Sequence, residues 1–299
     1  SIGLYRIARS RGKKSYIVLN NVNHALKNMH ERMKKEDGHY IESIITTEKA
    51  MEIADQNTLI VVLDTHRKSY TEAPELLDQI DKVVLIDHHR RSEEYIENTL
   101  LDYIEPYASS TCELVAELIQ YMEEHIKLTK FDADALMAGI VVDTNSFTFK
   151  TGIRTFEAAA FLKRKGADNV EVKELFNESI DFMKKKTEII ERSEIIFDDV
   201  AVSYIDEYSD DSNVAAAQSA DELLTIKDVK VSFVLVRNKD YINISGRSLG
   251  DVNVQLIMEY LGGGGHLNMA GAQINTNDME VAKAKLYEAI AQYKKESKQ

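Results

Sequence analysis

The sequence is poor in several residue types, and each scarcity excludes a class of protein. It has a single cysteine, Cys112, so no disulfide bond can form within the chain, which is consistent with a reducing compartment. No stretch approaches the ~18 consecutive apolar residues of a membrane-spanning helix, so we expect this part of the protein to make no membrane contact. Lys and Arg number 37 against 50 Asp and Glu, which gives a net charge of -13. We therefore expect no binding of long nucleic acid, which usually needs a basic face.

The first half of the chain alternates short apolar strands with helical segments. Hydrophobic residues make up 44% of the 299 residues, enough for one large domain or two ordinary ones. Strands are predicted at 16–19, 41–45, 59–63 and 83–86, and helices at 1–11, 25–35, 48–55 and 74–80. This alternation predicts an α/β fold with a parallel sheet and helices on both of its faces.

Helices dominate the middle of the chain, and a second α/β pattern follows. Helices are predicted at 109–124, 131–142, 155–165, 169–177 and 180–195, and the last is interpreted as a bridge between two domains. Strands at 200–205, 231–236, 241–245 and 272–275, with a helix at 252–260 and another at the end, predict a smaller α/β domain. We therefore predict a domain at 1–179, a linker helix at 180–198 and a domain at 199–299.

The strongest candidate site is the triplet Asp87-His88-His89, which follows the apolar run 83–86. It falls at the carboxyl end of a predicted buried strand, where open α/β sheets place their ligands. One carboxylate and two imidazoles are costly to bury without partners, and a metal ion is the usual partner. Asp64 follows the preceding strand in the same way, and His66 either supports the site from behind or lies on the surface.

Asp143 is a third candidate, because it ends the apolar helix at 131–142. Carboxylates combined with imidazoles suit Mn²⁺, Zn²⁺ or Fe, and a carboxylate-rich set favours Mn²⁺ or Mg²⁺. Two metal ions that share a carboxylate can activate a water molecule and hold a phosphate. Asp64 and Asp143 could equally be ordinary turn or capping residues.

Three further segments could bind an anion. The run 262–265 has four glycines before His266; it would expose backbone N–H groups and let a ligand approach closely, or it is simply a flexible loop. Arg247 could pair with a phosphate or form a surface salt bridge. Ser109, Ser110 and Thr111 could hold an anion at a helix N-terminus or merely cap that helix.

Four segments together resemble the DHH/DHHA1 phosphodiesterases, and the resemblance covers essentially the whole chain: 61–64, 87–89, 141–144 and 262–266. The Gly-Arg-Ser at 246–248, ahead of the glycine run, is most similar to the catalytic part of GdpP-type cyclic-di-AMP phosphodiesterases. This resemblance implies a DHH domain followed by a DHHA1 domain, and two Mn²⁺ ions per site.

The resemblance also implies roles for individual residues. Asp64, His88 and Asp143 would contact metal, and Asp87 would orient His88 from behind. His89 and His266 would act on the scissile phosphate as the catalytic side chains. The substrate would be held by a further set of residues: Asn145, Arg247, Gly263, Gly264, Gly265 and His266. Three more ligands would come from a His-x-x-x-Asp-x-Asp string, which is absent from residues 1–299 and which we expect upstream of Ser1 in a longer protein.

The implied function is a hydrolase that opens cyclic-di-AMP to the linear dinucleotide pApA by attack of a metal-bridging hydroxide. The implied location is the cytoplasmic side of a membrane-anchored parent protein. A homodimer is expected because dimers are the commonest soluble oligomers. Two alternatives stay open: an enzyme that cuts short oligonucleotides or nucleoside bisphosphates, and a nucleotide-binding module without catalysis. An acidic protein that handles a phosphate ester needs local positive charge, from metal or from a few basic side chains.

Overall fold

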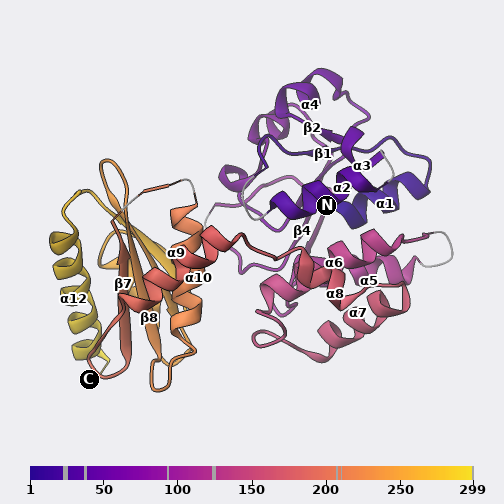
Figure 1. The fold of residues 1–299 in the computed structure, drawn as a ribbon. Helices are drawn as coiled ribbons and strands as arrows, with labels where there is room; N and C mark the ends of the chain where they lie inside the picture. Colours follow the sequence, from indigo (N-terminus) through magenta and orange to yellow (C-terminus); the bar gives the residue numbers. More distant parts are fainter. Residues whose placement is uncertain are drawn as a thin grey trace. The chain divides into compact units, whose positions relative to one another are not determined.

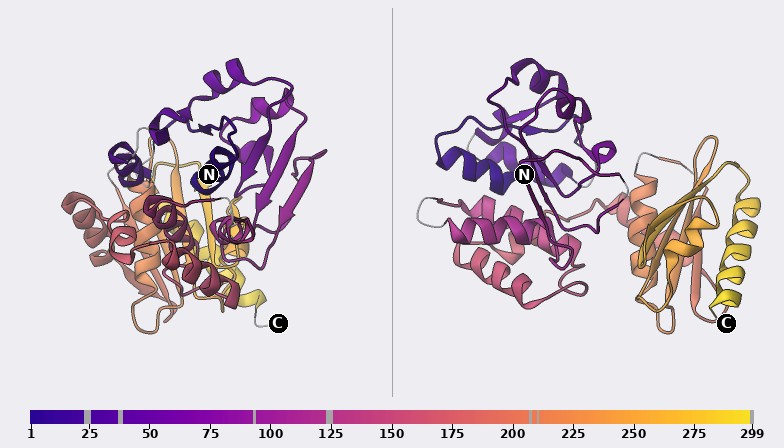
Figure 2. Two further views of the ribbon diagram at one scale, coloured as in Figure 1. Left: turned by 90° about the vertical axis from the view of Figure 1, so that its right-hand side faces the viewer. Right: turned by 180° about the vertical axis from the view of Figure 1, so that it is seen from behind.

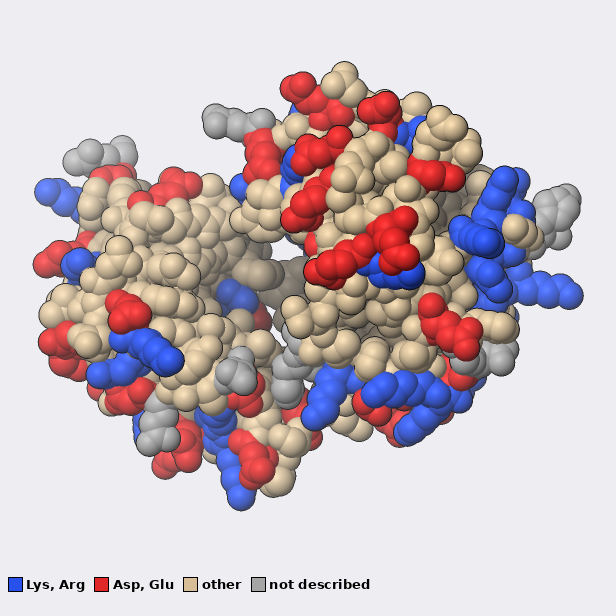
Figure 3. Space-filling view, turned by 90° about the horizontal axis from the view of Figure 1, so that it is seen from above, with Lys and Arg blue, Asp and Glu red and all other residues tan. Residues whose placement is uncertain are grey.

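The structure is a computed structural model that describes residues 1–22, 26–36, 39–92, 94–122, 126–206, 208, 209 and 211–297. The chain divides into two compact units, Ser1–Asn177 and Glu178–Gln299 (Figure 1). On the face seen in Figure 3, acidic and basic side chains are interspersed on each unit. No helix among the described residues is long and apolar enough to cross a membrane.

The first unit contains two small parallel sheets. Strands β3 (Ile60–Leu63), β4 (Val83–Asp87) and β5 (Leu101–Ile104) form one in the order β3-β4-β5, and β1 (Ile17–Val18) pairs with β2 (Ile44–Ile45) in the other. Leu85 in the central strand is fully buried, as expected for a strand covered on both sides. The predicted α/β class with a parallel sheet is confirmed.

Most helices of the first unit lie where the apolar spacing of the sequence predicted a helix. Around the sheets lie α1 (Ile2–Ser10), α2 (Lys27–Lys35), α3 (His39–Glu42), α4 (Thr47–Ile53) and two 3₁₀ helices, η2 (Lys68–Tyr70) and η3 (Pro74–Asp78). Helices α5 (Thr111–Tyr121), α6 (Lys130–Asp143), α7 (Ile153–Arg164) and α8 (Asn169–Glu174) pack together around an apolar cluster (Figures 1 and 2). The predicted helix limits at 25 and 124 lie outside the described residues.

One local prediction in this unit was partly wrong, and one strand was missed. In the segment predicted as a strand at 41–45, the first two residues end helix α3 and only the last two form strand β2. The Tyr40 ring is 2% exposed and packs at the edge of the Phe131 ring, which holds this turn against the core. Strand β5 was not predicted, because this edge strand is largely exposed and lacks a continuous apolar run.

The second unit is a six-stranded mixed sheet with helices on both faces. Its order is β10-β11-β9-β8-β7-β6, in which only β7 and β8 run parallel. The strands are β6 (Glu194–Ile196), β7 (Val200–Ile205), β8 (Val231–Arg237), β9 (Ile242–Ser248), β10 (Gly264–His266) and β11 (Met269–Ile274). In β8, Phe233 and Leu235 face a core shared with α11 (Val254–Glu259) and α12 (Met279–Glu296), while Val234 and Val236 face the opposite core. This alternation is the period-two pattern of a strand buried on both sides.

Helix α9 (Ile180–Glu191) belongs to the second unit (Figure 1). It is shorter than the predicted linker helix, because the chain turns after Glu191 and enters β6. Phe182 and Ile189 are buried against the sheet and against α10 (Ser212–Leu223). The buried Lys186 pairs with Glu178 at 2.7 Å and with Glu222 of α10 at 2.8 Å. These contacts tie the first residues of the unit to its core.

Candidate metal and phosphate site

The two parallel strands β3 and β4 bring the strongest candidates to one sheet edge. Their register pairs Leu63 with Ile86, so the residues that follow both strands emerge side by side. The Asp64 amide donates to the Ile86 carbonyl at 3.0 Å, which fixes this arrangement. Asp64 itself has a φ of 65°, a left-handed conformation that is uncommon outside glycine and is often found at functional sites.

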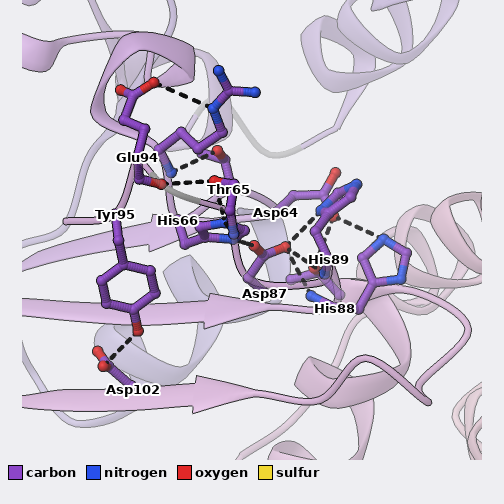
Figure 4. A network of polar contacts seen from close by, with 12 residues as sticks. Asp64, Thr65, His66, Asp87, His88, His89, Glu94, Tyr95 and Asp102 are labelled. Atoms are coloured by element: carbon purple, nitrogen blue, oxygen red, sulfur yellow. Dashed lines mark hydrogen bonds and ion pairs between the residues drawn. The ribbon is translucent and has the colours of Figure 1, made fainter. Parts of the chain in front are cut away.

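Three side chains predicted as metal ligands, Asp64, His88 and Asp143, converge at this edge, and Figure 4 shows the first two. The Nε2 atom of His88 lies 3.4 Å from Oδ1 of Asp64 and 4.0 Å from Oδ2 of Asp143 at the end of α6. Donor atoms of Asp64, His88 and His89 lie within 4.8 Å of one another. Atoms at these separations can bind one ion together, because metal–ligand distances to nitrogen and oxygen are about 2.0–2.2 Å. His89 therefore joins the set of possible donors.

The Asp87 carboxylate lies beneath this cluster and is fully buried. Its Oδ1 accepts from Nδ1 of His89 at 2.7 Å and from the backbone amides of His88 at 2.8 Å and His89 at 3.1 Å. Its Oδ2 lies 2.6 Å from Nδ1 of His66. Burial by itself would raise the pKa of Asp87, but the hydrogen bonds from His89 and His66 hold it well below its usual range.

This geometry corrects the role predicted for Asp87. The carboxylate contacts His88 only at the backbone amide, whereas Nδ1 of the His88 ring lies 3.3 Å from the carbonyl of Ala108. Asp87 instead orients the rings of His89 and His66. His66 is 2% exposed, so it supports the site from behind, which was one of the two roles predicted for it. Its Nε2 accepts from the Ser92 backbone amide at 3.0 Å, so Nδ1 is the donor toward Asp87.

Side chains at the N-terminus of α5 cap the helix, and one of them contacts Asp64. Ser110 accepts from the Glu113 amide at 3.0 Å, and the Ser109 hydroxyl donates to the Glu113 carboxylate at 2.5 Å. Thr111 donates to Oδ1 of Asp64 at 2.8 Å. The capping interpretation of these hydroxyls is therefore the one that the structure supports, and Thr111 adds a function that the sequence did not indicate.

The electrostatics of the cluster favour a bound cation. Burial and the neighbouring negative charge of Asp64 together raise the pKa of Asp143 to about 7. Burial and the neighbouring His89 lower the pKa of His88, which favours the neutral imidazole that can bind a metal. The hydrogen bond to Asp87 raises the pKa of His89. A cation between Asp64 and Asp143 would offset their mutual repulsion.

The predicted substrate residues of the glycine run lie in or beside an edge strand of the second unit's sheet. A Cβ atom on Gly263 would lie 2.2 Å from the Gly271 carbonyl oxygen, and one on Gly265 would lie 2.5 Å from that of Met269, so close packing requires both glycines. Gly264 has open space around its Cβ position. The run 264–266 is strand β10 at the edge of the sheet, which corrects the flexible-loop alternative.

The other predicted substrate residues occupy defined places. His266 is exposed in β10, opposite Met269 of β11. Arg247 in β9 donates from Nε to Asp221 at 3.0 Å, so it forms the salt bridge that was one of its two predicted roles. Asn145 is exposed, lies two residues after Asp143 and has a φ of 44°.

Sequence reasoning missed several contacts because partners far apart in sequence make them. Thr111 reaches Asp64 across 47 positions, and Ser92 reaches His66 across 26. His66 carried one usable signal, since it follows the same strand end as Asp64. Ala108 contributes only its backbone carbonyl, so no side-chain pattern could have identified it.

A parallel-sheet unit with a carboxylate–imidazole cluster at its carboxyl edge, followed by a mixed-sheet unit, defines a class of two-domain α/β protein with a candidate metal site. Residues 1–140 match the DHH family, N-terminal domain, and residues 198–293 match the DHHA1 domain. The chain belongs to the DHH/DHHA1 family, as the four sequence segments indicated.

Relatives with assigned names are similar over nearly the whole chain. The cyclic-di-AMP phosphodiesterase GdpP of Geobacillus thermodenitrificans is 44% identical over 98% of this chain, and that of Bacillus subtilis is 41% identical over 98%. The chain spans 45% of the length of each relative. An exopolyphosphatase-related protein from Bacteroides fragilis superposes with a TM-score of 0.82 and 24% identity, covering 100% of this chain and 89% of that one. This likeness confirms the fold.

Proposed function

We propose that this chain is the catalytic part of a metal-dependent phosphodiesterase that hydrolyses cyclic-di-AMP to pApA. The observation that carries the proposal is the convergence of Asp64, His88, His89 and Asp143 in a chain 44% identical to a cyclic-di-AMP phosphodiesterase over 98% of its length. A carboxylate–imidazole cluster supplies the donor types that phosphoester-cleaving metal sites use.

The donor set fits a divalent metal ion. The buried His88 imidazole lies 3.4 Å from the Asp64 carboxylate and 4.0 Å from the Asp143 carboxylate. Asp87 fixes the neighbouring His89 from behind. We propose Asp64, His88 and Asp143 as the metal ligands of this chain. Mn²⁺ is the favoured ion because oxygen donors outnumber nitrogen donors, and we propose two ions per site. When bound, the metal would neutralise phosphate charge and activate a water molecule.

His89 is proposed to contact the scissile phosphate. Its side chain is 34% exposed, whereas that of His88 is 6% exposed, so the His89 ring is the one that an incoming substrate reaches. Asp87 orients the ring through Nδ1, and Nε2 is the nitrogen that we propose to act on a phosphoryl oxygen. Such a preorganised donor would stabilise charge that develops on the phosphate in the transition state.

The second unit is proposed to bind the rest of the dinucleotide. Strand β10 is the outermost strand of its sheet, so backbone N–H groups on its open side are placed to donate to an anion. Gly264 leaves room for close approach, and His266 lies beside it. Gly263, Gly265, Arg247 and Asn145 complete the proposed substrate set. For Arg247, this role requires phosphate to compete with Asp221.

The test uses the full-length protein with Mn²⁺, and measures the conversion of cyclic-di-AMP to pApA by chromatography. His88→Ala should reduce turnover at least about a hundred-fold, because it removes a proposed ligand. His30→Ala, on helix α2, is the matched control and should leave turnover unchanged. Undiminished turnover in His88→Ala would overturn the assignment.

The same assay measures substrate preference. Faster cleavage of pApA or of a short oligonucleotide than of cyclic-di-AMP would replace the proposed substrate, and binding without turnover would indicate a nucleotide-binding module. Cyclic-di-GMP serves as the base-specificity control. The homodimer and the cytoplasmic placement in a membrane-anchored parent protein stay predictions.

A further inference from the structure

The two oxygens of the buried Asp87 carboxylate have unequal numbers of hydrogen-bond donors. Oδ1 accepts from the amide of His88 and from the amide and the ring of His89. Oδ2 accepts from Nδ1 of His66 at 2.6 Å, and in the described part of the chain no other donor contacts it. Because the Asp87 side chain is fully buried, bulk water cannot take the place of this donor. One half of the carboxylate therefore depends on His66 alone.

A short segment after β4 holds the His66 ring in place. The amide of Ser92 donates to Nε2 at 3.0 Å, which leaves Nδ1 as the donor to the carboxylate. The ring of Tyr95 lies against the His66 ring, with ring centres 5.4 Å apart. The Tyr95 hydroxyl in turn donates to Asp102 of β5 at 2.6 Å (Figure 4). These contacts fix both the tautomer and the orientation of His66.

The contacts of His66 continue through Asp87 to His89. Rotation of an aspartate carboxylate about its Cβ–Cγ bond has only broad intrinsic preferences, so its hydrogen-bond partners decide its orientation. The two oxygens move together, and the donor on Oδ2 therefore also determines where Oδ1 lies. Oδ1 accepts from Nδ1 of His89 at 2.7 Å, and this contact orients the His89 ring. His66 thus acts on the site through a side chain that it contacts directly.

We propose that His66 is a positioning residue for the hydrolysis, because it holds the Asp87 carboxylate in the orientation that keeps the His89 ring aimed at the scissile phosphate. This inference rests on the proposed function, in which His89 acts on the phosphate. It adds a buried residue that does not belong to the group of possible metal donors among the described residues. A misplacement of about 1 Å in a reacting group can cost about a hundred-fold in rate, so a remote residue can control turnover.

Two amide variants separate the two contacts of the His66 ring. The amide nitrogen of His66→Asn can take the place of Nδ1, so this variant keeps a donor to Asp87 and loses the acceptor for the Ser92 amide. The longer side chain of His66→Gln reaches the place of Nε2, so it keeps an acceptor for the Ser92 amide and loses the donor to Asp87. Both variants are neutral and polar, and each is therefore the matched control for the other.

The experiment measures steady-state kinetics of the full-length protein and its variants on cyclic-di-AMP with Mn²⁺. We expect His66→Gln to lower kcat about thirty-fold and to change KM less than about three-fold, because the lost orientation matters in the transition state. His66→Asn should keep kcat within about five-fold of the wild type. Mn²⁺ affinity, measured by calorimetry, should change less than about three-fold in both variants, since His66 is not among the proposed ligands.

A double-mutant cycle distinguishes positioning of His89 from a general structural role. In a His89→Ala background the ring that His66 helps to orient is absent, so His66→Gln should change kcat less than about two-fold. A general loss of structure would instead lower kcat by the same factor with and without His89. Tyr95→Leu, which removes the ring packed on His66, is the milder variant for the same cycle. It should lower kcat about three-fold when His89 is present and leave it unchanged when His89 is absent.

Circular dichroism checks that each variant folds, and the cycle with Tyr95→Leu decides the matter if His66→Gln does not. If the wild type hydrolyses cyclic-di-AMP and folded His66→Gln keeps the wild-type kcat, the inference about His66 is wrong and the proposed function stands. Equal losses of kcat in His66→Gln and His66→Asn, or equal losses with and without His89, overturn it in the same way. If the wild type itself shows no turnover, the proposed function fails, and the role of His66 fails with it.

Discussion

Replacing Asp87 with asparagine tests whether the buried carboxylate organises the site. Four donors end on this side chain: the rings of His66 and His89 and the backbone amides of His88 and His89, at 2.6 to 3.1 Å. An amide keeps one acceptor oxygen but presents an NH₂ group to the remaining partner. Because Nε2 of His66 accepts from the Ser92 amide, its Nδ1 must donate, and it would face another donor.

The expected loss of unfolding free energy is about 3 kcal/mol. A hydrogen bond to a charged group contributes about 1.5–3 kcal/mol, and removing one partner of a buried charged pair costs about 3–5 kcal/mol. Urea denaturation followed by circular dichroism measures the loss, with EDTA present so that bound metal does not stabilise either protein. A double-mutant cycle with His66→Gln should show a coupling energy of at least about 1 kcal/mol. A loss below about 1 kcal/mol for Asp87→Asn, or additive effects in the cycle, would refute the reasoning.

Three other variants or reactions probe separate parts of the structure. Thr111→Val removes the hydroxyl that holds Asp64 and should weaken Mn²⁺ binding about ten-fold by calorimetry, whereas Thr111→Ser should not. Gly265→Ala places a Cβ 2.5 Å from backbone atoms at a residue with a φ of 150°. It should lower the unfolding free energy of the second unit by about 1–3 kcal/mol in urea titrations. Gly264→Ala is the matched control, and an equal loss of stability in that variant would contradict the packing argument. Burial raises the pKa of the Cys112 thiol to about 11, so it stays protonated at pH 8. Alkylation of native protein at pH 8 should therefore be about a hundred-fold slower than in urea, and comparable rates would show an accessible thiolate.

The sheet edge of the site could be predicted because it depends on a local rule. Asp64 and Asp87 each follow an apolar strand, and parallel strands bring their carboxyl ends to one edge. The placement of Asp143 against His88 came from family resemblance. It could not come from periodicity, since the end of α6 reaches the site only through packing among several helices.

The missed features share a physical cause, which is that tertiary contacts overrode local preference. Helix α3 takes the first two residues of the strand predicted at 41–45, because Tyr40 packs in an aromatic cluster with Tyr5 and Phe131. The contact between Asp87 and the His66 ring joins residues that are 21 positions apart in sequence, so it depends on the turn that follows β3. The salt bridge of Arg247 depends on α10, which supplies Asp221.

Helix α9 has a consequence for how this architecture could be exchanged between proteins. The match to the DHHA1 domain begins at residue 198, yet the compact unit begins at Glu178. If recombination joined two proteins at residue 198, the transferred segment would lack Phe182 and Ile189. The face of the sheet that these two side chains cover would then be exposed. If the crossover lay at the start of α9, the transferred segment would contain the helix, the ion pairs of Lys186 and the sheet. The unit of inheritance is therefore expected to be about twenty residues longer than the recognisable sequence domain.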